Sequence, residues 1–357
     1  MRQNNIFLML LKVFFFSLIL VATSAVRAEL KVVTTIKPLH SLIANVMDGV
    51  GEPVLLIEGS TSPHSFTLKP SHAKLLEEAD LIFWVGESIE TFMERPLESI
   101  VKNAEVVEFM EVESINKLKF REESIFEDHD DHDDHDDHED HDDYDDHDDH
   151  EDHDDHDDHE EHDDHDDHEE HDDHDEHDDQ NGHDDHGHAH GEFDAHIWLD
   201  PMNAKEMVHE IAHELGDLDP VNKNKYEANA QATIQALDQL INDIEKGINK
   251  DAKFVVFHDA YQYFEERFGV RAAGALTLNT DVLPGAKQIA DIQDVIKDRG
   301  IKCIFSEPQF NPKIITTIAE DMNIKTGVFD PLGANIDSNK SLYFKLITNL
   351  GDELKGC

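Results

Sequence analysis

The chain has 357 residues, enough for roughly two domains of about 100–200 residues each. Its formal net charge of −53, from 82 acidic and 29 basic residues, argues against the basic face that nucleic-acid binding requires. Much of this charge is local, because residues 127–192 hold 39 of the acidic residues and no Lys or Arg. Without these 39 charges the net charge is −14, which is ordinary for a soluble acidic protein.

The N-terminus has the pattern of a secretory signal. Arg2 precedes a mostly apolar stretch, which includes the run Val13-Phe-Phe-Phe-Ser-Leu-Ile-Leu-Val-Ala22. Val26-Arg-Ala28 then places small residues where signal peptidase reads them. The apolar run is shorter than the ~20 residues that span a bilayer. We therefore expect residues 1–28 to be a signal peptide that is cleaved after Ala28, and the mature protein to be exported.

Strand and helix signals alternate on both sides of the acidic tract. The segments that read as short buried strands are 30–36, 54–57, 81–85 and 105–109 before it, and 253–257, 270–276, 301–305 and 327–329 after it. Helical segments begin near Pro38, Ser71, Ser88, Ala260, Pro284, Pro312 and Ser341. Strands that alternate with helices of this length indicate parallel α/β sheets. We expect one such lobe over residues 29–218 and a second over 250–357.

The tract itself is of low complexity. From His129 to His186 a His occurs at every third position except 144 and 180, with pairs of acidic residues between. Such a segment has almost nothing apolar to bury, so it cannot offset the entropy lost on ordering. We interpret residues 127–192 as a metal-binding insertion in the first lobe that is disordered without metal.

A long helix is predicted between the two lobes. Asp219-Pro220 offers an N-cap and a proline for the first turn. An apolar stripe then runs from Tyr226 to Ile248 in steps of three and four residues. At 1.5 Å per residue this helix would be roughly 40 Å long. We expect residues 219–249 to join the lobes rigidly, with a ligand site in the cleft between them.

The chain has two cysteines, Cys303 and Cys357. In an exported protein an even number of cysteines is typical of disulfide pairing, and we predict one bridge between them. A metal site of thiolates is the alternative, but the sequence offers no further ligands close to either cysteine.

Seven histidines lie outside the tract, and three have positions that suit ligand binding. His258 ends a predicted strand, His64 follows one, and His196 stands directly after the tract. Asp330 ends the last predicted strand, and ligands of open α/β sheets bind at the carboxyl ends of strands. Imidazoles with one carboxylate suit Zn²⁺. Glu307 also follows a strand and is a candidate to support these ligands through hydrogen bonds.

A competing motif is His209-Glu-Ile-Ala-His213, which matches the H-E-x-x-H pattern of zinc proteases. On a helix its two histidines point away from the apolar positions Ala204, Met207, Val208, Ile211 and Leu215. We interpret this face as solvated. A secreted protease that uses His209, Glu210 and His213 stays an alternative hypothesis, as does a passive metal store in which only the tract binds metal. His40 and His72, at predicted helix starts, are expected to have structural or surface roles.

Several motifs together resemble those of the zinc-specific solute-binding proteins of ABC importers. They are Ser65-Phe-Thr-Leu-Lys-Pro-Ser71, Trp84-Val-Gly86, His196-Ile-Trp-Leu-Asp-Pro201, Phe257-His-Asp-Ala-Tyr261, Ser306-Glu-Pro-Gln-Phe310 and Asp330-Pro-Leu-Gly333. The resemblance covers nearly the whole mature chain. It implies two lobes joined by a rigid helix, often with a His-rich insertion and a C-terminal disulfide.

The resemblance also implies a function and its residues. His64, His196 and His258 match the family's zinc ligands, and Asp330 matches a carboxylate ligand of manganese-type members. His258 stands where manganese-type members tend to have Glu, which favours Zn²⁺, although another divalent metal such as Mn²⁺ is the alternative. Pro63 replaces an acidic residue found in some relatives, so Asp330 or water would complete the shell. The expected protein is a monomer that is not an enzyme and that delivers zinc to a membrane permease.

Overall fold

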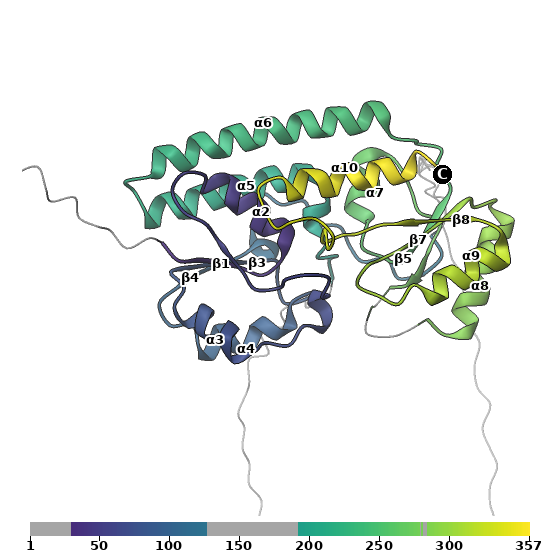
Figure 1. Cartoon of the computed structure of the whole chain (residues 1–357), viewed down its shortest axis with the longest axis horizontal. Coiled ribbons are helices and arrows are strands. Elements are labelled where there is room, and N and C mark those ends of the chain that lie inside the picture. Colours follow the sequence, from purple (N-terminus) through teal and green to yellow (C-terminus); the bar gives the residue numbers. More distant parts are fainter. Residues whose placement is uncertain (1–29, 127–191, 279, 281–283) are drawn as a thin grey trace, which may run out of the picture. The chain divides into compact units, whose positions relative to one another are not determined.

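In the part of the chain that the structure describes, eight short strands form two parallel four-stranded sheets, which confirms the predicted α/β class (Figure 1). The first sheet has the order β2-β1-β3-β4 and the second the order β6-β5-β7-β8. The strands of the first sheet are β1 (Val32–Thr34), β2 (Val54–Leu55), β3 (Leu81–Trp84) and β4 (Glu105–Glu108). Those of the second are β5 (Phe254–His258), β6 (Ala275–Thr277), β7 (Cys303–Ser306) and β8 (Lys325–Val328). The computed structural model describes residues 30–126, 192–278, 280 and 284–357. The predicted signal peptide and nearly all of the acidic tract lie outside these ranges.

Helices alternate with the strands as expected. The elements of the first half are α2 (Lys37–Val46), η1 (Pro63–Ser65), α3 (Pro70–Glu77), η2 (Thr91–Met93), α4 (Glu94–Ser99) and η3 (Phe109–Glu111), where η marks a 3₁₀ turn. Those of the second half are η4 (Ile197–Leu199), α5 (Pro201–Leu218), α6 (Lys223–Gly247), α7 (Gln262–Phe268), α8 (Ala286–Asp298), α9 (Lys313–Met322) and α10 (Leu342–Leu354). Strands β1, β3 and β5 are buried along their whole length, as the continuous apolar sequence of central parallel strands requires. None of the described helices combines the length and the apolar character needed to cross a bilayer.

The helix predicted near Ser88 begins later, at Glu94. The cause is Glu90, a fully buried residue whose carboxylate accepts the backbone N–H groups of Val85 at 2.7 Å and Gly86 at 3.3 Å. These bonds close residues 85–90 into a turn before helix can form. Burial raises the pKa of Glu90 to about 7, against the opposing effect of the hydrogen bonds it accepts.

The predicted long helix is present as α6, with 25 residues and a length of about 37 Å. Its N-cap is Asn222, so the expected capping role of Asp219 is wrong. Asp219 instead ends α5, and its carboxylate accepts hydrogen bonds from the Asn222 amide at 2.6 Å and the Tyr226 hydroxyl at 3.2 Å. The described residues group into one compact unit, so the lobe boundaries at 218 and 250 stay predictions.

The segments on either side of the acidic tract are held by backbone pairing. Lys119 and Phe193 form an antiparallel bridge, and the amide of Asp194 donates to the carbonyl of Leu118 at 2.8 Å. Further along, Ile125 forms an antiparallel bridge with Gly274, the residue directly before β6. A Cβ atom at Gly274 would lie 2.6 Å from the Ser124 carbonyl oxygen, so only glycine allows this close approach. The chain is therefore fixed up to residue 126 and again from residue 192, four residues before His196.

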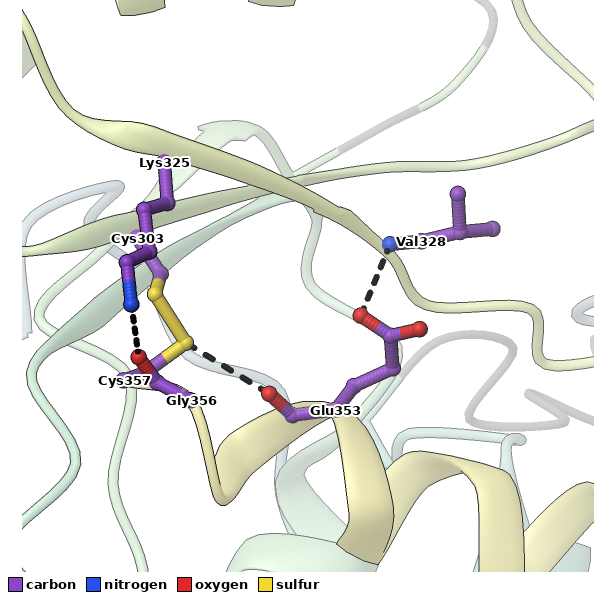
Figure 2. The surroundings of a disulfide bond; sticks show 6 residues. All are labelled: Cys303, Lys325, Val328, Glu353, Gly356 and Cys357. Carbon is purple, nitrogen blue, oxygen red and sulfur yellow. Dashed lines mark hydrogen bonds between the residues drawn. A yellow bond between two sulfur atoms is a disulfide. The ribbon is translucent and has the colours of Figure 1, made fainter.

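The predicted disulfide between Cys303 and Cys357 is present, with Cα atoms 5.6 Å apart (Figure 2). It joins the first residue of β7 to the end of the chain, just after α10. The Lys325 ammonium donates to the carbonyl of Gly356 at 2.8 Å, and Glu353 accepts the Val328 amide at 3.4 Å. Together these contacts attach the C-terminal helix to strands β7 and β8.

Removing both cysteines, as Cys303→Ala/Cys357→Ala, is expected to lower the free energy of unfolding by about 4 kcal/mol. The bridge closes a loop with a sequence separation of 54, and the open chain gains the corresponding entropy when it unfolds. Urea unfolding with and without a reductant measures this. The reductant should destabilise the unaltered chain and leave the double variant unchanged. A loss below about 1 kcal/mol would contradict the entropic role.

Candidate metal centre

Three of the four predicted ligands converge. One ring nitrogen from each of His64, His196 and His258 can be chosen so that all three atoms lie within 4.8 Å of one another. The Nε2 atoms of His196 and His258 are 3.3 Å apart, and the ring centroids of the three residues are 5.2 to 6.0 Å apart. Among the residues that the structure describes, this is the only group of three or more His, Cys, Asp or Glu that meets this geometry.

The fold brings the three histidines together from separate elements. His258 is the last residue of β5, His64 lies in the η1 turn that follows β2, and His196 is the N-cap of η4. Two of them therefore stand beyond the carboxyl ends of parallel strands, one from each sheet, where α/β folds place ligands. His196 and His258 are only 5% and 4% exposed, so water competes little at this place.

Two buried carboxylates set the orientation of two of the rings. Asp194 lies 2.7 Å from Nδ1 of His196, and Glu307 lies 2.6 and 2.8 Å, through its two oxygens, from Nδ1 of His258. An ionised carboxylate only accepts hydrogen bonds, so Nδ1 carries the proton in both rings. The Nε2 lone pairs are then free and face each other, which is the arrangement that metal-binding histidines require.

The third ring has a nitrogen without a partner. Nε2 of His64 is buried and makes no hydrogen bond in the structure. Burial, with the nearby His196 and His258, lowers the pKa of His64 to about 2. This imidazole is therefore neutral at any physiological pH. A buried acceptor without a donor is costly, and a cation in the centre would satisfy it.

His258 has the opposite tendency. Burial alone lowers its pKa, but the charge of Glu307 and the hydrogen bond to it outweigh burial, and the pKa is raised. A proton on Nε2 of His258 would occupy the space between this ring and His196. The space between the two rings therefore favours a positive charge, either a proton on His258 or a metal ion.

The residue set fits Zn²⁺. Zinc binds imidazole nitrogen at about 2.0–2.1 Å in tetrahedral geometry, which separates neighbouring nitrogens by roughly 3.3 Å. The His196–His258 separation of 3.3 Å matches this value. His64 supplies the third nitrogen of a triangle, which leaves one position of a tetrahedron open.

Asp330 is not brought into this group. Its Oδ1 accepts the amides of Leu332 at 3.2 Å and Gly333 at 3.0 Å, and its Oδ2 accepts that of Ala334 at 2.6 Å. The Gln309 side chain donates a further bond at 3.0 Å. Asp330 lies two residues after β8, and the turn that follows it takes up both carboxylate oxygens.

The two histidines of the H-E-x-x-H motif are exposed, as predicted from the helical pattern. His209 and His213 are exposed on α5, while Met207, Val208 and Ile211 are buried. His213 is near Asp217, with 3.4 Å between Nδ1 and Oδ2. The structure thus offers this pair no buried third ligand among the described residues.

Two carboxylates that orient the ligands were harder to predict from the sequence than the ligands themselves. Glu307 was expected to support the ligands, and it does so through His258. Asp194 was missed, although it stands two residues before His196 and its Oδ1 also accepts the His196 amide at 2.9 Å. An Asp-x-His spacing next to a predicted ligand was the available signal. His40 and His72 have local contacts instead, with the Pro53 carbonyl at 3.1 Å and the Lys69 amide at 3.2 Å.

Solved structures of similar fold include metal-binding proteins. The chain is similar to the structure titled "Crystal structure of ZnuA", at 19% identity and a TM-score of 0.64, over 91% of this chain and 98% of that one. It is also similar to a laminin-binding protein of Streptococcus agalactiae described as having adhesin and metal transporting activity. That match has 22% identity and a TM-score of 0.63, over 91% of this chain and all of the other. At these identities the likeness supports the fold alone.

Sequence relatives are much closer. The chain is 46% identical over 328 residues to the high-affinity zinc uptake system protein ZnuA of Brucella abortus (strain 2308), covering 91% of each. It is 31% identical to the ZnuA protein of Yersinia pestis, over 96% of this chain and 95% of that protein. The family model described as "Zinc-uptake complex component A periplasmic" matches residues 32–357. The chain therefore belongs to the ZnuA family of periplasmic zinc-uptake components.

Proposed function

We propose that this protein captures Zn²⁺ at the three-histidine centre and hands it to the membrane permease of an ABC importer. The observation that carries the proposal is the pair of carboxylate-oriented rings, His196 with Asp194 and His258 with Glu307, which direct two free Nε2 atoms toward each other. His64 supplies the third nitrogen. A water molecule fills the fourth position unless Asp330 releases the backbone of residues 332–334.

X-ray absorption on the full chain with one equivalent of zinc tests this ligand set. We expect three imidazole nitrogens at about 2.0–2.1 Å, because a single equivalent fills the tightest site first. His64→Ala should reduce the number of imidazoles to two, while His213→Ala, on the exposed face of α5, should leave three. A shell made mainly of carboxylate oxygens, or one that His64→Ala leaves unaltered, would reject the proposed site.

Zinc is the proposed metal in preference to Mn²⁺. The centre offers three nitrogens and no carboxylate among its converging ligands, whereas Mn²⁺ prefers oxygen ligands. Competition between the two metals on the full chain distinguishes them. An excess of Mn²⁺ that displaces one equivalent of zinc would favour the manganese alternative.

Capture and release, without catalysis, is the activity that we propose. Relatives in this family are named as components of a zinc uptake system. The proposed signal peptide, cleaved after Ala28, would place the mature chain in the periplasm. Glu210→Gln separates this role from the protease alternative, since it would abolish hydrolysis by an H-E-x-x-H enzyme and leave zinc binding intact.

The acidic tract is proposed to be an auxiliary arm that collects zinc weakly and supplies the centre. Replacing its twenty histidines with serine keeps the length and negative charge of residues 127–192 and removes the imidazoles. We expect zinc uptake by cells to fall under severe zinc scarcity and to be normal when zinc is abundant. Unaltered uptake under scarcity would reject this role. Loss of all tight zinc binding would favour the passive-store hypothesis.

A further inference from the structure

A buried lysine from the first half of the chain lies behind one wall of the metal centre. Lys37, the first residue of α2, is 5% exposed. Its ammonium donates to three backbone carbonyls, of Gly333 at 2.6 Å, Ala334 at 3.1 Å and Ile336 at 2.6 Å. An ammonium has three N–H groups, so this set of acceptors accounts for all of them.

The acceptors belong to residues 331–336, called here the wall segment. Its first two residues, Pro331 and Leu332, line the same pocket as the three histidines. The indole of Trp198, two residues after His196, donates to the carbonyl of Pro331 at 2.8 Å. The wall segment is thus attached to the metal centre on one side and to Lys37 on the other.

Asp330 complements Lys37. The carboxylate accepts amides from the wall segment at residues 332, 333 and 334, while the ammonium takes carbonyls from the same segment. Both kinds of backbone group are therefore satisfied by a charged side chain. Such bonds contribute more than neutral ones, and removal of one partner leaves buried groups unpaired.

We propose that Lys37 is a positioning residue for metal retention: it holds the wall segment against the three-histidine centre, so the metal leaves only when this segment moves. The inference rests on the proposed metal site. Burial lowers the pKa of Lys37, while the charges of Asp330 and Asp337 oppose this effect. Because Lys37 belongs to α2, its contact with the wall segment connects metal release to a helix of the first half of the chain that carries no metal ligand.

An ion pair between the residues that follow α2 and the C-terminal segment provides a matched control. Lys340 forms an ion pair with Asp48 at 2.6 Å, and both side chains are about half exposed. Exposed pairs contribute little to stability. Lys340→Met therefore removes the same charge from the same region without touching the wall segment.

The test is the rate of zinc dissociation from the full chain loaded with one equivalent of Zn²⁺, followed after addition of excess chelator. Lys37→Met removes all three hydrogen bonds from the ammonium to the wall segment and should accelerate the slow phase by at least about 10-fold, the effect of losing one bond to a charged donor. The association rate should change by less than about twofold, because Lys37 contacts no ligand in the described structure. Lys340→Met should leave both rates unchanged.

The indole of Trp198 gives a second, spectroscopic readout. In a Trp84→Phe background, Trp198 is the one remaining tryptophan of the sequence. The metal-free Lys37→Met protein should emit at longer wavelength, since the Pro331 carbonyl would leave the indole and water would enter. A role of Lys37 in stability alone would lower the unfolding midpoint without this shift.

Each outcome has a distinct meaning. No slow phase in the unaltered chain would reject the metal site, and this inference with it. A slow phase that a folded Lys37→Met protein retains, or that Lys340→Met accelerates equally, would reject only the role of Lys37. If Lys37→Met fails to fold, Lys37→Gln replaces it, because the amide keeps two donors; it should give a smaller acceleration, and an unchanged rate would overturn the inference.

Discussion

Replacing His258 with alanine is expected to weaken zinc binding at the three-histidine centre by more than about 100-fold. Structural zinc sites bind with about 10–16 kcal/mol, which is roughly 3 kcal/mol for each of four ligands. His258 supplies one of the two nitrogens that stand 3.3 Å apart. The substitution also leaves Glu307, a carboxylate that is 3% exposed, without its imidazole partner. Calorimetry on the full chain measures the loss as disappearance of the tight phase.

The matched control for this experiment is His209→Ala. His209 is a histidine on the exposed face of α5, so this variant measures the effect of removing an imidazole that does not belong to the centre. We expect the tight phase to be unchanged in this variant, while weak binding by the tract persists in both. Unchanged tight affinity in a folded His258→Ala protein would refute the assignment of the centre.

The second large effect is expected from Glu307→Gln, which should lower zinc affinity about 10- to 100-fold. Glu307 contacts Nδ1 of His258 with both oxygens and also accepts the His258 amide at 3.3 Å. The amide of glutamine is nearly the same size but neutral, so it raises the basicity of the imidazole less and no longer enforces one tautomer. Competition with a zinc chelator of known affinity provides the measurement.

Glu320→Gln removes an equal charge from the exposed side of α9 and is the control for net charge. Its affinity should equal that of the unaltered chain. If Glu307→Gln binds zinc as tightly as this control, orientation by Glu307 contributes nothing to zinc affinity. The carboxylate would then serve only as a hydrogen-bond acceptor for the buried His258 ring. A matching loss in Asp194→Asn would extend the role to the His196 pair.

The α/β architecture could be predicted because short segments of the sequence carry the pattern of each strand and helix. Segments such as 81–85 and 254–257 are continuous apolar runs, which is how central parallel strands appear in a sequence. The α6 stripe and the two cysteines were also readable, since helical periodicity and an even cysteine count need no knowledge of contacts. Errors occurred where a side chain competed for backbone groups, as Glu90 does before α4.

From the sequence alone, His258 and Asp330 could be placed at the ends of predicted strands and His64 in the loop after one. Tertiary structure alone decided which of them meet. The three histidines come from positions up to 194 residues apart, and their rings are aimed by Asp194 and Glu307 through hydrogen bonds. Asp330 stays outside this group, and its carboxylate accepts the amides of residues 332–334 instead. The position of a strand depends on the local sequence pattern. The direction of a buried polar side chain depends instead on which groups, distant in the sequence, can form hydrogen bonds with it.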